Sequence, residues 1–360
     1  PKVQRGFSDA LFLLESYENI LDSGIKTLDP KFMLLGMHTI LNKFILGTLL
    51  PNNLALASIT VSLIISFIFW RNLKEFLIQK NSLLLWITIF LPGYFIYSTL
   101  PTKEATFIAI SIIYICFEAK NIVYKPIKNW NQSNILIRRI IYLIIGTALR
   151  GVPNIPYVLL GFFITAFPLI SPFLIKYKDR KSNYLILLII SAFFTFFCVG
   201  ILIGSDNQYF LSRGVHFQAS FLTSYSNLSR FFLLNKNPFE LINFIKLPYL
   251  SLFPTINELL SFPKLIFYVL ESLAFVGIYV YSWKKVININ LLSPKKIKFL
   301  QYLFIAVTIS YIFVYGIIGA YNLGSAFRFR QNFANLGLIL PLLIFSNYRT
   351  RKSLTESNSL

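Results

Sequence analysis

The sequence predicts an all-α fold: a polytopic transmembrane helical bundle of about nine to ten spans. Hydrophobic residues make up 56% of the 360 positions and charged residues only 13%, against roughly a quarter charged in a soluble domain. Apolar runs recur along the chain, and several approach the roughly 20 residues that a helix needs to cross a bilayer. The runs are continuous rather than alternating, and an open sheet cannot cross lipid, so strands are not expected.

Taken in order, the apolar runs place the membrane spans along one integral membrane domain, residues 1–360. The expected spans are 54–70, 83–100, 105–117, 140–149, 158–175, 184–203, 265–283, 299–320 and 333–346. Three of these are short, and we expect them to extend into their flanks, tilt or be partly re-entrant. The short spans are 105–117, 140–149 and 333–346.

Basic residues set the predicted orientation. Most of the 34 Lys and Arg lie in alternate loops and in the C-terminal tail. Those loops are 71–82, 118–139, 176–183 and 284–298. Because Lys and Arg accumulate in cytoplasmic loops, we expect these loops and the C-terminus to face the cytoplasm. The net charge of +20 then reports orientation and some attraction to anionic lipid. It does not indicate nucleic-acid binding, for which no basic face or stacking module is present.

The N-terminal segment, residues 1–53, is expected outside. Residues 32–50 are apolar but contain His38, Asn42 and Lys43, which favours an interfacial or re-entrant helix. Because the span 54–70 then runs inward, we expect a further span to precede residue 1. The alternative is that 32–50 is a true span and the N-terminus is internal.

A long hydrophilic loop, residues 204–264, is also expected outside. Residues 216–234 can form an amphipathic helix that lies on the membrane. Loops of this length in compact proteins are usually functional, and we expect this one to contribute to a site.

Several classes of function are not expected. Cys116 and Cys198 lie in apolar spans, which argues against a disulfide framework or a thiolate metal site. His38 and His216 are the only histidines, and the chain has no P-loop, dinucleotide fingerprint or Asp-x-Asp pair. We therefore expect no metal, no cofactor and no ATP-driven pump. Glu271 is the one carboxylate well inside a span, so a proton relay has little to work with. We expect it to face the interior and hydrogen-bond a hydroxyl.

The short outer loops carry few cations, and these run against the orientation rule. They are Lys103, Arg150, Arg328 and Arg330. Thr102 is a candidate N-cap, which places Lys103 and Glu104 in the first turn of a helix. Glutamate suits the helix dipole there and lysine does not. Each cation, taken alone, also fits the role of an anchor at the membrane interface.

Together these residues indicate a site for a lipid diphosphate. Guanidinium groups bind phosphate through paired hydrogen bonds and lysine binds it as a point charge, and the three outer boundaries can build one pocket at headgroup depth. An enzyme using such a donor needs cations for the leaving diphosphate and a carboxylate to deprotonate an acceptor hydroxyl. The outer carboxylates available are Glu104, Asp9, Glu15 and Asp206.

Short motifs carry a family resemblance. The stretch 91–98 followed by Pro101-Thr102-Lys103-Glu104 resembles the outer-loop signature, a proline, aromatic residues, serine and then Lys-Glu, of bacterial polysaccharide polymerases and related membrane glycosyltransferases. The segment 322–330 resembles their late Gly-x-x-x-Arg-aromatic-Arg signature. Arg150 resembles the mid-chain arginine of this group, and Asp9 resembles an acidic residue of its first outer loop. Two departures, Thr102 in place of the usual serine and no proline near the closing arginines, bear on the subfamily rather than the class.

The resemblance implies a multi-pass enzyme of the bacterial inner membrane that makes O-antigen, capsule or exopolysaccharide. Such an enzyme transfers a growing glycan from undecaprenyl diphosphate to the next lipid-linked repeat unit, on the outer leaflet and without a metal. The implied roles are diphosphate binding by Lys103, Arg150, Arg328 and Arg330, base catalysis by Glu104 or Asp9, and glycan binding by Asp206, Arg213 and His216. The implied partners are membrane lipid and the chain-length regulator and flippase of the same pathway.

Three alternatives stay open at this point. The nearest is a membrane glycosyltransferase that takes one sugar from a polyprenyl phosphate donor. The second is a flippase for lipid-linked oligosaccharides, which should have related halves or more cavity-lining charge; the sequence has neither. The third is a non-catalytic scaffold, which leaves the outer cations unexplained.

Overall fold

The computed structural model describes this chain as a set of helices. The described residues are 54–77, 83–99, 103–150, 154–176, 241–289, 292–312 and 323–357. The helices are α4 (Leu54–Leu77), α5 (Leu83–Ile89), α6 (Pro92–Thr99), α7 (Lys103–Tyr124), η2 (Ile127–Asn129), α8 (Ser133–Arg150), α9 (Ile155–Lys176), α13 (Leu241–Leu252), α14 (Ile256–Ser261), η4 (Pro263–Leu265), α15 (Ile266–Ile287), α16 (Pro294–Ser310), α18 (Leu323–Ala334), the π-helical turn η6 (Asn335–Ile339) and α19 (Leu340–Ser357). Every regular element in these ranges is helical, which confirms the all-α class.

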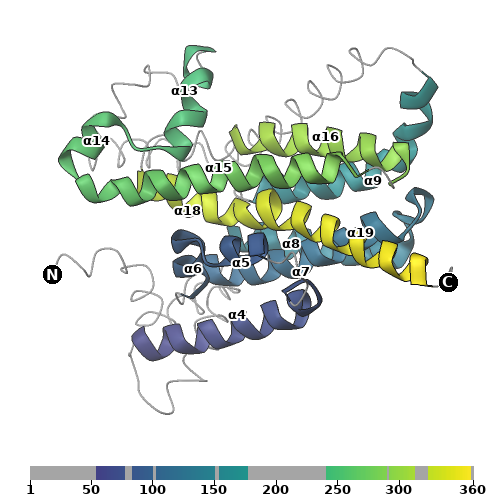
Figure 1. The fold of residues 1–360 in the computed structure, drawn as a ribbon, viewed down its shortest axis with the longest axis horizontal. Helices are drawn as coiled ribbons and strands as arrows, with labels where there is room; N and C mark the ends of the chain where they lie inside the picture. Colours follow the sequence, from purple (N-terminus) through teal and green to yellow (C-terminus); the bar gives the residue numbers. More distant parts are fainter. Residues whose placement is uncertain are drawn as a thin grey trace, which may run out of the picture.

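The long helices lie roughly side by side, with α4 along one edge and α15 with α16 along the other (Figure 1). Helix α7 packs against α4, α8 and α19, and α9 packs against α16. Helix α18 contacts α6 and α13 before it continues through η6 into α19. The chain therefore brings α6, α7 and α18, which are far apart in sequence, to one place.

Two segments in the described part of the chain are long and apolar enough to cross a membrane. They are Glu104–Tyr124 and Pro263–Ile287, and Ile155–Leu169 is a shorter apolar helix. The first two coincide with the expected spans 105–117 and 265–283. The larger bundle of about nine to ten spans stays a prediction.

The other expected spans overlap described helices except for 184–203, which lies outside the described residues. The N-terminal segment 1–53 and the amphipathic helix expected at 216–234 lie outside them as well. The second half of the long loop contains α13, α14 and η4. Thr255 caps α14 by accepting a hydrogen bond from the Glu258 amide at 3.2 Å, and the Glu258 carboxylate accepts one from the Thr255 amide at 2.7 Å.

The expected span 83–100 is two helices rather than one. Helix α5 ends at Ile89, and α6 begins at Pro92. Proline is favoured at the first position of a helix because its missing N–H would have no intrahelical partner there. The break leaves the amide of Gly93, at the start of α6, available to a group outside the helix.

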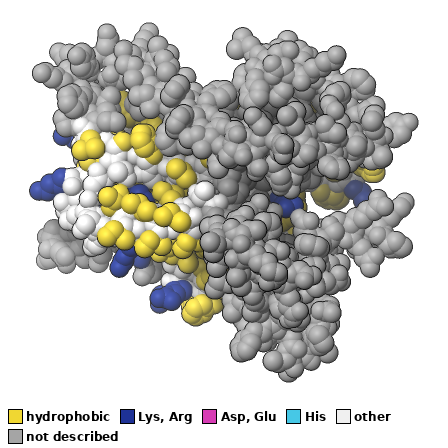
Figure 2. All heavy atoms as spheres, turned by 180° about the vertical axis from the view of Figure 1, so that it is seen from behind, with side chains coloured by type: hydrophobic (Ala, Val, Ile, Leu, Met, Phe, Trp, Pro, Cys, Tyr) yellow, Lys and Arg dark blue, Asp and Glu magenta, His cyan; other side chains and the backbone are white. Residues whose placement is uncertain are grey.

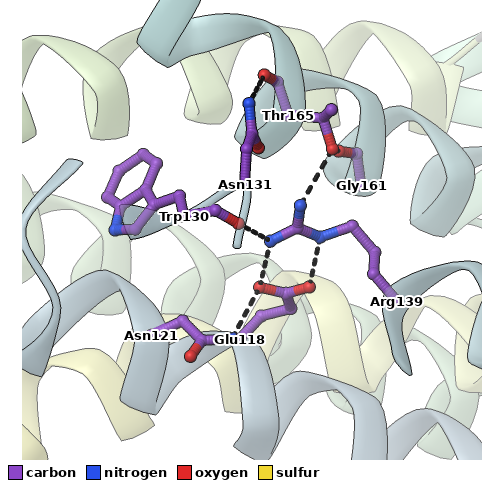
Figure 3. Close-up of polar contacts among 7 residues, drawn as sticks. All are labelled: Glu118, Asn121, Trp130, Asn131, Arg139, Gly161 and Thr165. Carbon is purple, nitrogen blue, oxygen red and sulfur yellow. Dashed lines mark hydrogen bonds and ion pairs between the residues drawn. The ribbon is translucent and has the colours of Figure 1, made fainter. Parts of the chain in front are cut away.

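The expected loop 118–139 contains a buried ion pair, which corrects the sequence analysis. Glu118 belongs to α7 and Arg139 to α8, and both are buried. Arg139 Nε donates to Glu118 Oε1 at 2.6 Å and Nη2 donates to Oε2 at 3.1 Å (Figure 3). The number of charged residues in 118–139 predicted a solvent-exposed loop. Because the two charges pair, both residues instead lie buried within helices α7 and α8.

The same guanidinium ties α9 to this pair. Arg139 Nη1 donates to Thr165 Oγ1 at 2.9 Å, and Nη2 reaches the Trp130 carbonyl at 3.4 Å (Figure 3). The hydrogen bonds and the attraction from Glu118 offset the cost of burying the Arg139 guanidinium. Arg139 therefore joins α7, α8 and α9.

Lys296 hydrogen-bonds to the C-terminal end of α7. Its Nζ donates to the carbonyls of Ile122 at 2.5 Å and Val123 at 3.1 Å, and the side chain is buried. The last carbonyls of a helix have no intrahelical partner and carry the negative end of its dipole. A residue expected in the 284–298 loop thus caps α7.

Apolar side chains face outward on several helices. On α8 they recur at helical spacing, at Ile137, Ile140, Ile141 and Ile144. Figure 2 shows apolar side chains gathered on the described part of one face, with Lys and Arg at its edges. Helix α8 therefore exposes apolar side chains and buries Arg139, whereas a helix at the surface of a water-soluble protein usually exposes its charged side chains and buries its apolar ones.

Replacing Arg139 with Met is expected to destabilise the protein, because Glu118 is then buried without a counter-charge. We expect a loss of about 3–5 kcal/mol, measured by thermal unfolding in detergent. The double variant Glu118→Leu with Arg139→Met should recover most of it. Arg138→Met, at the exposed neighbouring position, is the control and should change stability by less than about 0.5 kcal/mol. Equal losses in Arg138→Met and Arg139→Met would contradict this role.

Candidate functional site

Three of the boundaries predicted to lie outside are found at the same end of the helices. Helix α7 begins at Lys103, and α18 contacts its first turn through Arg328 and Glu104. Helices α7 and α8 run antiparallel, since Glu118 contacts Arg139 and the earlier Tyr114 contacts the later Tyr142. The end of α8 at Arg150 therefore lies level with the first turns of α7. The side chains of Lys103 and Arg150 lie outside the described residues.

Arg328 and Glu104 form an ion pair between α18 and α7. Arg328 Nε donates to Glu104 Oε1. Arg328 is 28% exposed, whereas Glu104 is 2% exposed. Glu104 lies in the first turn of α7, where the unpaired amides and the helix dipole stabilise a carboxylate. The cation is therefore the accessible member of this pair.

Arg330 points elsewhere and is fully buried. Its Nη2 lies 3.2 Å from Glu271 Oε1 on α15, and its Nη1 donates to Ser272 Oγ. The guanidinium carbon lies 4.7 Å from the ring centre of Tyr268 and 4.9 Å from that of Phe327. Such stacking on aromatic rings suits a guanidinium with few water contacts.

Glu271 joins three helices. It is buried and accepts hydrogen bonds from the Gly93 amide, at 3.2 Å to Oε1 and 3.3 Å to Oε2. Gln331 Nε2 donates to Oε1 at 3.1 Å. Glu271 faces the interior as expected, but its partners are a backbone amide, a side-chain amide and a guanidinium rather than a hydroxyl. It holds the start of α6 against α15 and α18.

Gly93 is required by this close approach. A Cβ at this position would clash with Phe327 and Gln331 and would lie 2.8 Å from Glu271 Oε1. Any larger residue must displace the ends of these side chains, including the carboxylate that accepts from the Gly93 amide. The Gly93 amide donates to Glu271, and the absence of a Cβ at Gly93 leaves room for that carboxylate.

Asn335 makes a second link, deeper along the same helix. Its Oδ1 accepts from the Tyr94 hydroxyl, and its Nδ2 donates to Ser111 Oγ at 2.5 Å and to the Ile108 carbonyl at 3.0 Å. Asn335 is the first residue of the π-helical turn η6. Helices α7 and α18 are therefore joined at Arg328, and about two turns further along the Asn335 side chain in η6 contacts α6 and α7.

The remaining predicted site residues are not placed. Asp9, Asp206, Arg213 and His216 lie outside the described residues. Of the predicted site, the structure brings together Glu104 and Arg328 and directs Arg330 to Glu271. Gln331 and Asn335 were missed, although their helical spacing with Arg328 is visible in the sequence.

No protein-family model, curated protein or solved structure matches this chain. The chemistry available must be inferred from the residues. Within the described ranges, no group of three or more His, Cys, Asp or Glu is placed to hold a metal ion. What the site offers is one partly exposed guanidinium beside one buried carboxylate at the start of a helix.

Gly93→Ala is expected to destabilise the protein by about 1–3 kcal/mol, because the added methyl overpacks the α6–α18 contact. Thermal unfolding measures the loss.

Gly277→Ala is the matched control, because a Cβ there meets nothing within 4 Å. Alanine in a helix is favoured over glycine by about 1 kcal/mol, so this variant should be as stable as the parent or more so. A similar loss at both glycines would contradict the close-approach argument.

Proposed function

We propose that the chain is an integral membrane glycosyltransferase that polymerises lipid-linked repeat units. The single observation that carries the proposal is the Arg328–Glu104 pair, in which the cation is accessible and the carboxylate is not. The motifs around both residues, which resemble those of polysaccharide polymerases, add the substrate class.

A phosphate group competes with Glu104 for Arg328. Guanidinium groups bind phosphate oxygens through two parallel hydrogen bonds, and Arg328 is the partner that a ligand reaches first. Binding of the ligand draws Arg328 outward and releases the Glu104 carboxylate. The amides at the start of α7 stabilise a carboxylate at Glu104, and in this scheme that carboxylate accepts a proton.

In the proposed step, Glu104 removes the proton from an acceptor hydroxyl. The hydroxyl oxygen then attacks the anomeric carbon of the donor sugar, and a new glycosidic bond forms. The bond from that carbon to the diphosphate oxygen breaks, and the leaving diphosphate takes the electron pair. Arg328 stabilises its charge. In this scheme Arg330 positions α18 and does not contact the ligand.

One observation favours a second candidate, transfer of a single sugar from a polyprenyl phosphate. Of the two arginines on α18, Arg328 is partly exposed, whereas Arg330 is buried and paired with Glu271. One guanidinium suits a monophosphate as well as a diphosphate. The two reactions differ in product, because one adds a single residue and the other adds whole repeat units.

The proposal includes the location and the partners. We place the site on the outer face of the bacterial inner membrane, with the C-terminus in the cytoplasm. The flippase and the chain-length regulator of the same pathway would supply the donor and limit the product.

Arg328→Lys is expected to reduce chain extension at least tenfold, because lysine keeps the charge and loses the paired hydrogen bonds. Each tenfold loss corresponds to about 1.4 kcal/mol of barrier. The assay is polymer formation in proteoliposomes with lipid-linked repeat units, read as a ladder on a gel. Glu104→Gln should also abolish extension, because the base is removed.

Arg138→Lys is the control, since Arg138 is exposed on α8 and lies outside the site. It should extend chains normally. Transfer of one sugar only would favour the second candidate. Normal ladders from Arg328→Lys, or lipid transport without any extension by the parent protein, would overturn the proposal.

A further inference from the structure

One buried amide in α18 has no hydrogen-bond partner. Asn332 is 1% exposed, and neither Nδ2 nor Oδ1 is bonded within the part of the chain that the structure describes. Gln331 Oε1, on the same turn, is unpaired as well. An unpaired buried polar group costs about 1–3 kcal/mol, and such groups are rare enough to require a cause.

The position of Asn332 follows from its neighbours on the helix. Arg328, Asn332 and Asn335 lie on one face, because they are four and three residues apart. Arg328 meets α7 at Glu104, and Asn335 meets it at Ile108. Asn332 therefore lies along α7 between these contacts, one turn inward from the partly exposed Arg328.

The backbone at Asn332 is fixed although its side chain is not bonded. The Tyr157 hydroxyl of α9 donates to the Asn332 carbonyl at 2.5 Å. The π-helical turn η6 begins three residues later, and π-helical turns are frequent at functional sites. A rigid backbone that presents an unsatisfied amide is arranged to receive a polar group.

We infer that the Asn332 amide is the inner part of the Arg328 site and binds a hydroxyl or acetamido group of the sugar. This rests on the proposed function, which supplies the sugar-bearing ligand. A primary amide donates two hydrogen bonds and accepts two, which matches the mixed donors and acceptors of a sugar. Asn332 is buried one turn inward from the Arg328–Glu104 contact, so in this proposal the sugar reaches it when the phosphate draws Arg328 outward.

The test uses an apolar variant of similar shape. Asn332→Leu removes the unpaired amide, so the ligand-free protein should unfold a few degrees higher than the parent. Asn335→Leu is the matched control, because the Asn335 amide is fully bonded. It should unfold at a lower temperature.

Binding is measured by calorimetry in detergent with two probes, farnesyl diphosphate and farnesyl diphosphate linked to N-acetylglucosamine. We expect the parent to bind the sugar-bearing probe about tenfold more tightly, a gain of about 1.4 kcal/mol. Asn332→Leu should bind both probes equally and bind the plain diphosphate as the parent does. Asn332→Ala provides the same comparison if the leucine variant does not fold.

The outcomes separate the two proposals. If the parent binds neither probe, the proposed function fails and this inference fails with it. If the plain probe binds in an Arg328-dependent way but the sugar adds nothing, or if Asn332→Leu keeps the gain, only this inference is overturned. A fall in ligand-free stability of Asn332→Leu equal to that of Asn335→Leu overturns it too, since the amide then has a structural partner.

Discussion

An ionised side chain inside a bundle of apolar helices needs an opposite charge or several hydrogen bonds, and this requirement determines how the described helices meet. Three carboxylates pair with three guanidinium groups in the described ranges, each across two helices. The pairs are Glu104 with Arg328, Glu118 with Arg139, and Glu271 with Arg330. Loss of the arginine leaves a buried carboxylate without its counter-charge, so each pair favours one register and one distance of its helices. The pair with the most exposed arginine is Glu104 with Arg328, and it is the pair that the proposed phosphate would open.

Helix geometry explains why two neighbouring arginines have different environments. Arg328 and Arg330 are two residues apart, and successive residues turn by about 100° in an α-helix, so their side chains leave α18 on nearly opposite sides. Arg328 contacts α7 and is partly exposed, whereas Arg330 is buried against α15 and aromatic rings. The sequence reading treated them as one phosphate-binding pair because it placed them at a boundary rather than within a helix.

Sequence patterns predict local features here and miss the long-range ones. The helical class, the start of α7 and the place of Glu104 in its first turn follow from apolar runs and capping. The partners do not follow, because Gly93 and Glu271 are 178 residues apart and Glu104 and Arg328 are 224 apart. Glu118 was predicted to lie in a loop for the same reason, because a count of charges does not show that Arg139 on the next helix pairs with it. The role of Gly93 depends on Phe327 and Gln331, which no local spacing indicates.

The distribution of polarity is the physical reason to propose a membrane. Helix α7 has 72% of its apolar window buried and carries two of the buried carboxylates, whereas α15 has only 28% buried. On α15 the large side chains of Phe267, Leu270 and Leu273 face outward. In water each such exposed side chain lacks the roughly 1.5–3 kcal/mol of stabilisation that burial would give it. The buried ion pairs do not compensate for this loss. A hydrocarbon surround removes the first penalty and strengthens every internal ion pair, because no water competes for the partners. In that setting the phosphate of the proposed ligand would compete with Glu104 for the partly exposed Arg328.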